Sequence, residues 1–102
     1  MVVEYIRYAV KDGARRQELV AAYVEAAKSL DAAPDCLGYE LTVCEEDETA
    51  AVLRIEWVST EAHLQGFRKS APFRTFFAAI GPFVQEIAEM RHYTPTPVVG
   101  RK

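Results

Sequence analysis

Two alternating segments joined by a short polar loop constrain the fold of this chain more than any other feature. In residues 37–45 (LGYELTVCE) and 50–58 (AAVLRIEWV), apolar and polar side chains alternate, as they do in half-buried β-strands. The acidic residues 45–48 lie between them, where a solvated hairpin loop explains four acids better than a metal site does. The hairpin's apolar face carries Leu37, Tyr39, Leu41, Val43, Ala51, Leu53, Ile55 and Trp57.

The segment before this hairpin predicts a strand followed by a helix. Residues 2–10 are rich in β-branched and aromatic side chains, which favours a strand. After Asp12-Gly13 a helical stripe follows, and Pro34 marks its end because proline cannot continue a helix. The stripe consists of Leu19, Ala22, Tyr23, Ala26 and Leu30.

After the hairpin the pattern predicts two short helices and a last strand. The hydroxyl of Ser59 or Thr60 can cap a helix that runs to about Lys69. Pro72 suits the first turn of a second helix, which the glycine and proline at 81–82 end, and residues 86–93 can form a strand. The second helix is expected to point Phe73, Phe76, Phe77 and Ile80 inward.

The order strand, helix, strand, strand, helix, helix, strand predicts an α+β, ferredoxin-like split βαβ fold. An antiparallel sheet then carries its helices on one face. Residues 1–94 form the domain, and 95–102, with two prolines and no period, form an extended tail. The other face is expected to be solvated or to meet a second copy through paired charges. It carries Tyr5, Arg7, Glu40, Thr42, Arg54, Glu56, Ile87, Glu89 and Arg91.

Charge and composition exclude several classes of function. The net charge of -3 and pI of about 5.4 argue against nucleic-acid binding, which needs a basic surface. No apolar run is long enough to span a membrane, and the N-terminus lacks the pattern of a signal peptide, so we expect a cytoplasmic protein. Cys36 and Cys44 lack zinc-ligand spacing, and we expect two reduced thiols and no metal.

Residues 56–77 (EWVSTEAHLQGFRKSAPFRTFF) concentrate the aromatic side chains of the chain. They hold the single tryptophan, one of the two histidines and four of the five phenylalanines. An apolar core and the wall of an apolar pocket have the same pattern in sequence, so both interpretations stay open here. An enzyme needs a polar group aimed into such an apolar pocket, whereas a binding protein or a purely structural dimer does not.

Three motifs resemble those of the antibiotic biosynthesis monooxygenase family, within the dimeric α/β-barrel superfamily. They are Glu56-Trp57-x-Ser59-x-Glu61-Ala62, Ser70-x-Pro72-Phe73-x-x-Phe76 and Arg7-Tyr8-x-Val10-x-Asp12-Gly13. The resemblance covers Val2 to about Thr94. It implies a homodimer whose two sheets pack into a barrel, with a pocket between sheet and helices in each subunit.

The resemblance also implies an activity. Many such proteins are cofactor-independent monooxygenases, which oxidise electron-rich aromatic or polyketide-derived hydroxy compounds of the quinol or anthrone type with O2. Haem-degrading relatives carry an asparagine, a tryptophan and a haem-ligating histidine, which align here with Ile6, Phe67 and Phe77. Because phenylalanine cannot ligate iron, this argues against haem degradation. The alternative function is a non-catalytic small-molecule binding or regulatory homodimer on the same scaffold.

On this model the candidate site takes its residues from the sheet and the two short helices. His63 and His92 are the candidate catalytic residues, each as base or hydrogen-bond partner, and each could equally be structural. Arg54, Glu56, Glu89 and Arg91 fall on the opposite face, where pairing at a dimer interface explains them better than catalysis. The candidate substrate-binding residues, which could also be core, are Tyr8, Tyr39, Trp57, Phe67, Phe73 and Phe77.

Overall fold

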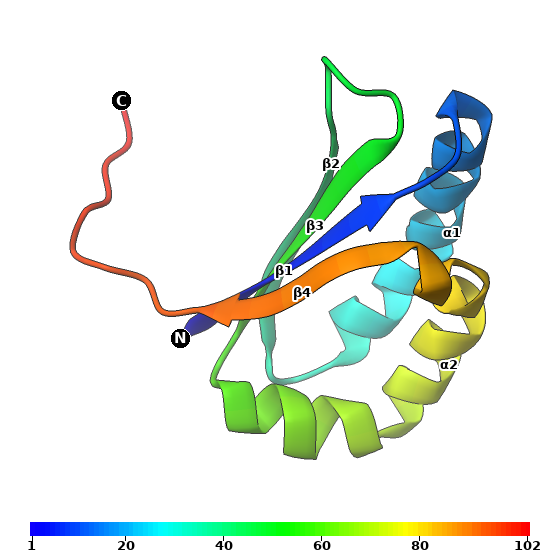
Figure 1. Ribbon diagram of the computed structural model, residues 1–102. Coiled ribbons are helices and arrows are strands. Elements are labelled where there is room, and N and C mark those ends of the chain that lie inside the picture. Colours follow the sequence, from blue (N-terminus) through cyan, green and yellow to red (C-terminus); the bar gives the residue numbers. More distant parts are fainter.

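The computed structural model describes all residues, 1–102, and its strands and helices follow the predicted order (Figure 1). The strands are β1 (Val2–Ala9), β2 (Cys36–Val43), β3 (Ala50–Trp57) and β4 (Ile87–Tyr93). The α-helices are α1 (Gly13–Ala32) and α2 (Ala71–Ile80). Between β3 and α2 lie a π-helical turn, η1 (Ala62–Gly66), and a 3-10 turn, η2 (Phe67–Lys69). A second 3-10 segment, η3 (Gly81–Glu86), leads from α2 into β4.

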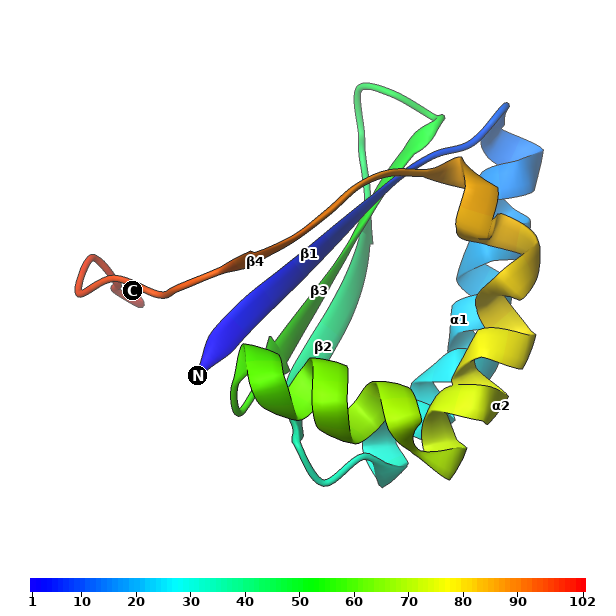
Figure 2. The ribbon, with the colours of Figure 1, turned by 60° about the horizontal axis from the view of Figure 1, so that its bottom comes forward.

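The four strands form one antiparallel sheet in the order β2-β3-β1-β4. All the helical segments lie on one face of this sheet, and the other face is uncovered (Figure 2). The predicted α+β ferredoxin-like fold is therefore confirmed. Because β1 and β4 pair with Glu4 opposite His92 and Ile6 opposite Met90, these four side chains share the helix-covered face.

Helix α1 begins where its sequence supplies a cap. The Asp12 carboxylate accepts a hydrogen bond of 2.8 Å from the Arg15 backbone N–H, which would otherwise have no partner in the first turn. The predicted stripe packs inward, with Leu19, Tyr23, Ala26 and Leu30 buried. Tyr23 meets Phe76 of α2 edge to face, with ring centroids 6.0 Å apart. The two long helices therefore close over the sheet as a single layer.

The alternation of β3 is confirmed residue by residue. Ala51, Leu53, Ile55 and Trp57 are each at most 1% exposed, while the residues between them are partly exposed. Strand β3 lies between β1 and β2, so its inward side chains form the middle of the core. Burial of such side chains contributes about 1.5–3 kcal/mol each, which makes β3 the best-anchored strand.

The connection from β3 to β4 departs from the predicted pair of helices. The helix expected to reach Lys69 is instead the π turn followed by the 3-10 turn. Ser70 then caps α2, because its Oγ accepts a hydrogen bond from the Phe73 N–H. The glycine and proline at 81–82 end the α-helix but not the helical path, which continues through η3.

The inward face of α2 is narrower than predicted. Phe76 and Ile80 are buried and Phe73 is half-buried, but Phe77 is 47% exposed. One residue beyond Phe76, Phe77 lies about 100° further round the helix, which places it at the edge of the covered face. Phe77, which was predicted to point inward with Phe76 and Ile80, therefore lies at the edge of the covered face and not in the core.

The uncovered face of the sheet carries the charged residues that were predicted for it. Tyr5 pairs with Arg54 on one side and Arg91 on the other, so these side chains share that face. Arg54 and Glu56 form an ion pair of 2.8 Å within the chain. Ile87 was predicted for the uncovered face, and this prediction is wrong. A register shift between Arg7 and Tyr8 places Ile87 opposite Tyr8, on the helix-covered face.

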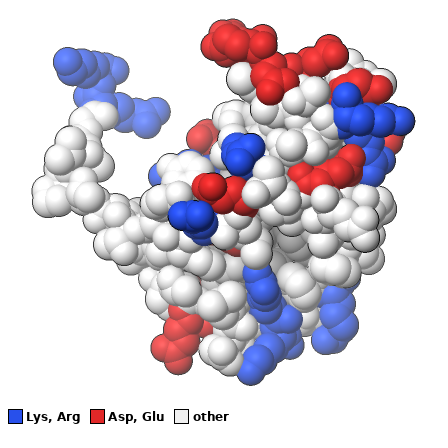
Figure 3. Space-filling view, viewed as in Figure 1, with Lys and Arg blue, Asp and Glu red and all other residues white.

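The acidic loop between β2 and β3 and the C-terminal tail lie at the surface, as their sequences predict. The acidic residues 45–48 are exposed in the β2–β3 loop, and acidic side chains gather at that tip in Figure 3. Residues 94–102 belong to no helix or strand and extend away from the domain (Figure 1). None of the helices is long and apolar enough to serve as a membrane span.

Candidate functional site

A cavity of about 220 Å³ lies between the helix-covered face of the sheet and the segments η1, η2, α2 and η3. Hydrophobic residues account for 13 of the 16 that line it; the other three are Glu4, His63 and Arg68. Such a space, mostly apolar with a few polar groups, is typical of small-molecule sites. Its aromatic wall consists of Tyr8, Tyr23, Trp57, Phe67, Phe73, Phe76 and Phe77.

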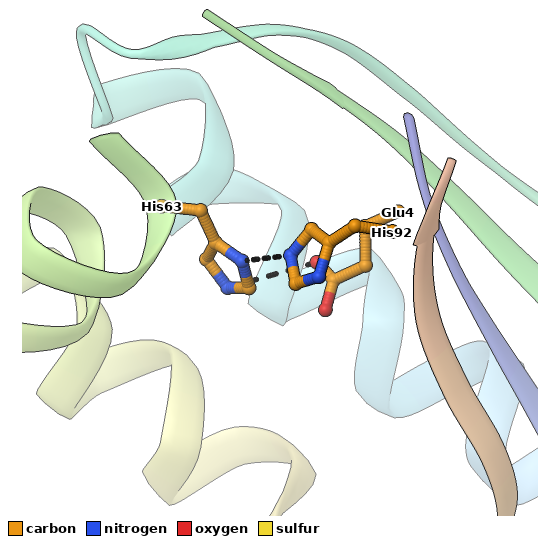
Figure 4. A group of neighbouring side chains, drawn as sticks. All are labelled: Glu4, His63 and His92. Atoms are coloured by element: carbon orange, nitrogen blue, oxygen red, sulfur yellow. Dashed lines mark hydrogen bonds and ion pairs between the residues drawn. The ribbon is translucent and has the colours of Figure 1, made fainter. Parts of the chain in front are cut away.

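Three elements bring Glu4, His63 and His92 together at one side of this cavity. Glu4 of β1 and His92 of β4 are direct neighbours across the sheet, and His63 of η1 lies over them (Figure 4). The Nδ1 atom of His63 is 2.8 Å from Nε2 of His92, a hydrogen-bond distance. The other ring nitrogen of His63, Nε2, is 3.6 Å from Oε1 of Glu4.

Glu4 is 1% exposed, and only one of its two carboxyl oxygens has a hydrogen-bond partner. The indole Nε1–H of Trp57 donates a hydrogen bond of 3.0 Å to its Oε1. Its Oε2 is buried and has no hydrogen-bond partner. A buried polar atom without a partner costs about 1–3 kcal/mol, so this oxygen marks a place where a partner is expected to bind.

Trp57 also holds the ring of His63. The two rings stack with centroids 4.5 Å apart and an angle of 8° between their planes. Phe67 packs against the same indole at 5.0 Å. Since Trp57 is fully buried, it fixes the carboxyl group of Glu4 through its N–H and the imidazole of His63 through its face.

Burial pushes these titratable groups toward their neutral forms. Loss of hydration raises the pKa of Glu4, against the lowering effects of the Trp57 hydrogen bond and Arg68. The same cause lowers the pKa of His63 from 6.5 to about 4, with further contributions from Arg68 and His92. Burial also lowers the pKa of His92. Burial therefore makes the carboxylate of Glu4 more basic and the imidazole of His63 less basic.

A second polar group in the cavity wall is the hydroxyl pair of Tyr8 and Tyr23. Their oxygens are 2.5 Å apart, and both side chains are buried. Burial raises the pKa of both phenols, so both stay protonated at neutral pH. Two hydroxyls share one hydrogen bond between them, which leaves one O–H free to donate to a bound molecule.

The structure gathers most of the predicted site residues around this cavity. His63, Tyr8, Trp57, Phe67, Phe73 and Phe77 all line it, with the exposed Phe77 among them. His92 does not line the cavity, but its ring contacts the ring of His63.

Tyr39 is the exception among the predicted residues. It lies on the helix-covered face, but its hydroxyl donates a hydrogen bond of 2.7 Å to Asp31 of α1, and it lines a separate groove beside Val20 and Val24. Strand β2 is at the edge of the sheet, separated from β1 by β3, so its side chains meet α1 and not α2. The prediction that Tyr39 binds the same ligand as Trp57 is corrected by this position.

Sequence reasoning missed Glu4 and assigned no site role to Tyr23. A signal for Glu4 was present, because it alternates with Ile6 and Tyr8 and so faces inward with them. A charged residue at an inward-facing position of a strand that is buried on one face is uncommon unless it has a partner or a function. Tyr23 belongs to the predicted buried stripe of α1, and only the packing of α1 on β1 places its hydroxyl beside that of Tyr8.

Comparisons with known proteins agree with this fold. A family model for antibiotic biosynthesis monooxygenases matches residues 1–79. The uncharacterized protein YczJ of Bacillus subtilis (strain 168) is 29% identical over 99 residues, which span 97% of this chain and 94% of that protein.

Solved structures show the same fold at lower identity. A candidate antibiotic biosynthesis monooxygenase from Bordetella bronchiseptica superposes with a TM-score of 0.77 at 23% identity, over 93% of this chain and 96% of that one. SnoaB from Streptomyces nogalater, a cofactor-independent oxygenase, superposes with a TM-score of 0.76 at 14% identity, over 98% and 97%.

Proposed function

The chain belongs to the antibiotic biosynthesis monooxygenase family, and we propose that it is a cofactor-independent monooxygenase. Its substrate is an electron-rich aromatic or polyketide-derived hydroxy compound of the quinol or anthrone type, and its oxidant is O2. The observation that supports this most is the buried carboxyl group of Glu4, which lines a mostly apolar cavity and whose Oε2 has no hydrogen-bond partner.

Glu4 is the proposed base and His63 its partner. A base works best when its pKa is near the working pH, and burial moves the pKa of Glu4 upward in that direction. His63 is too weakly basic for the same task, but its imidazole can hydrogen-bond a substrate hydroxyl and orient it. His92 holds the His63 ring through the contact of 2.8 Å.

The chemistry needs no electron donor other than the substrate. Glu4 removes a proton from the substrate, and the resulting anion supplies electrons to O2 as a carbon–oxygen bond forms. Glu4 returns its proton to the peroxide and then removes the second hydrogen of the same carbon as a proton: the O–O bond breaks, the ring carbon becomes a carbonyl, and the hydroxide that leaves takes up that proton as water. For a carbon bearing two hydrogens, one oxygen atom enters the product and the other forms water.

The size and wall of the cavity support a small aromatic substrate. An apolar cavity of about 150 Å³ holds benzene, so a space of about 220 Å³ suits a small aromatic compound better than a ligand as large as haem. Phe67, Phe73 and Phe76 present edges and faces to one another around the cavity, at centroid distances of 5.5 to 6.4 Å. Such walls favour flat π-systems.

The proposal includes a homodimer in the cytoplasm. The uncovered sheet face, with Tyr5 against Tyr93 at 5.4 Å and the Arg54–Glu56 ion pair, is the surface through which two sheets would meet. An exposed β-sheet face with aromatic side chains supports such an assembly, because it buries apolar area on both copies.

The first experiment follows the fluorescence of Trp57 during ligand titration. Trp57 is the single tryptophan and lines the cavity, so a bound aromatic compound is expected to quench its emission saturably. Anthrones, naphthoquinols, flavonols and haem are titrated separately, and naphthoquinols are expected to bind best and haem not at all. If none of them quenches Trp57, the cavity does not hold an aromatic ligand and the proposal fails.

The second experiment separates an enzyme from a non-catalytic binder. Oxygen consumption is measured with the quenching ligand for the wild type and for Glu4→Gln, which keeps the size of the side chain but removes the base. We expect the variant to bind the ligand and to consume oxygen at least ~100-fold more slowly, the usual contribution of a positioned base. Tyr39→Phe, outside the cavity, is the matched control. Binding without oxygen consumption in the wild type would establish the regulatory or binding alternative.

A further inference from the structure

We propose that Glu4, His63 and His92, the Glu4–His63–His92 triad, bind a divalent transition-metal cation such as Zn²⁺ or Fe²⁺. This inference goes beyond the proposed function and does not depend on it. Two imidazoles and one carboxylate are a ligand set that these cations prefer. The expectation of no metal rested on the spacing of the cysteines, whereas this triad joins residues that are far apart in the sequence.

The three side chains are already close enough to share one ion. One ligand atom from each residue lies within 4.8 Å of the other two. In a tetrahedral site with bonds of about 2.0–2.2 Å, ligand atoms are about 3.3–3.5 Å apart. His63 approaches His92 through Nδ1 at 2.8 Å and Glu4 through Nε2 at 3.6 Å, and because an imidazole binds an ion through a single nitrogen, these two contacts cannot both belong to the loaded site. A rotation that turns one nitrogen of each imidazole and one oxygen of Glu4 toward a common point completes the set.

The free oxygen of Glu4 is an independent indication of a missing ligand. Glu4 is 1% exposed, and its Oε2 is buried with no hydrogen-bond partner. Its side chain and the ring of His92 reach from adjacent strands toward the same side of His63 (Figure 4). A cation between them would give Oε2 a bond and would compensate the burial of the carboxylate.

Trp57 provides the support that a metal ligand requires. Its N–H holds Oε1 of Glu4, and its indole stacks on His63, so both side chains are already oriented. Hydrogen bonds from outside the ligand set typically contribute 10–100-fold to metal affinity. Glu4 and His63 also line the cavity, which leaves one coordination position open to a small molecule.

A bound cation and the proposed base use the same oxygen of Glu4. The loaded triad is therefore expected not to take a proton from the substrate, and added Zn²⁺ would slow the oxygenation. The two proposals remain separable, because cation binding can be measured with no substrate present.

The test uses full-length protein without an affinity tag, treated with EDTA and then desalted. Zn²⁺ binding is followed by calorimetry, and Co²⁺ binding by its visible absorption, which reports coordination geometry. We expect one cation per chain. Glu4→Gln and His92→Ala are each expected to weaken binding at least ~10-fold, and Trp57→Phe by a similar factor. His92 is only partly buried, so its variant keeps the fold, which circular dichroism verifies.

Cys36→Ser and Cys44→Ser are the controls, since thiols at the surface can also bind Zn²⁺. Both are expected to keep the wild-type affinity. The proposal is overturned if wild-type protein binds neither cation at millimolar concentration. It is equally overturned if binding survives both Glu4→Gln and His92→Ala, or if it is lost in a cysteine variant.

Discussion

Removing either member of the buried Glu4–His63 pair is expected to change the pH dependence of the protein's stability, in opposite directions for the two residues. Between pH 4.5 and 6.5 an unfolded chain carries an ionised Glu4 and a protonated His63, because their unperturbed pKa values are 4.5 and 6.5. In the folded protein, burial favours protonated Glu4 and neutral His63. Folding therefore favours proton release from the imidazole and proton uptake by the carboxylate, so the two groups contribute opposite pH dependences to the stability.

Relative to the wild type, the two variants are expected to change the slope of stability against pH with opposite signs. In Glu4→Gln only His63 remains, with a folded pKa depressed to about 4. Its contribution is present above pH 6.5 and is lost as the pH falls toward 4. One pKa unit corresponds to about 1.4 kcal/mol, so the loss amounts to about 3 kcal/mol. In His63→Phe only Glu4 remains, with a raised folded pKa. Its contribution is present below pH 4.5 and is lost as the pH rises through the folded value.

The measurement is urea unfolding by circular dichroism at half-unit steps from pH 4.5 to 7.5, in EDTA. The slope of the free energy of unfolding against pH is expected to be more positive in Glu4→Gln than in the wild type and less positive in His63→Phe. A loss of about 3 kcal/mol is large for a domain with a typical stability of 5–15 kcal/mol. Parallel profiles for the three proteins would refute the conclusion that burial controls the charge of this pair.

Further predictions concern single contacts. Phe76→Ala is expected to lower the free energy of unfolding by about 3–5 kcal/mol, whereas Phe77→Ala on the same helix, being half exposed, costs much less in the same urea experiment. Ser70→Ala removes the cap of α2 and is expected to cost about 1 kcal/mol, while Thr96→Ala in the tail leaves the urea midpoint unchanged. Tyr8→Phe removes one hydroxyl of the cavity pair and is expected to weaken a hydroxylated aromatic ligand by ~2–10-fold in the Trp57 titration, whereas Tyr39→Phe has no effect.

The sequence was sufficient for the fold because local patterns determined most of it. The alternation of β3, the Asp12 cap of α1 and the proline in the first turn of α2 each depend on neighbouring residues only. The predicted positions of Trp57, Phe67 and Phe73 in the cavity wall follow from the same patterns.

What could not be predicted depends on pairing between distant segments. The register of β1 and β4 decides that Glu4 meets His92 and that Ile87 turns inward, and a shift of one residue reverses both outcomes. Likewise, the position of β2 at the sheet edge separates Tyr39 from the cavity. No pattern within either segment contains that information.

The π-helical turn η1 has a consequence for how relatives of this chain are aligned. Its wide turn, in which the Phe67 N–H bonds the Ala62 carbonyl, accommodates one residue more than an α-helical turn does. A relative with a regular α-helix there would lack one residue, and an alignment without a gap would then pair His63 or Phe67 with the wrong partner. Residue correspondences across this segment are best assigned after placing a one-residue gap between Ala62 and Phe67.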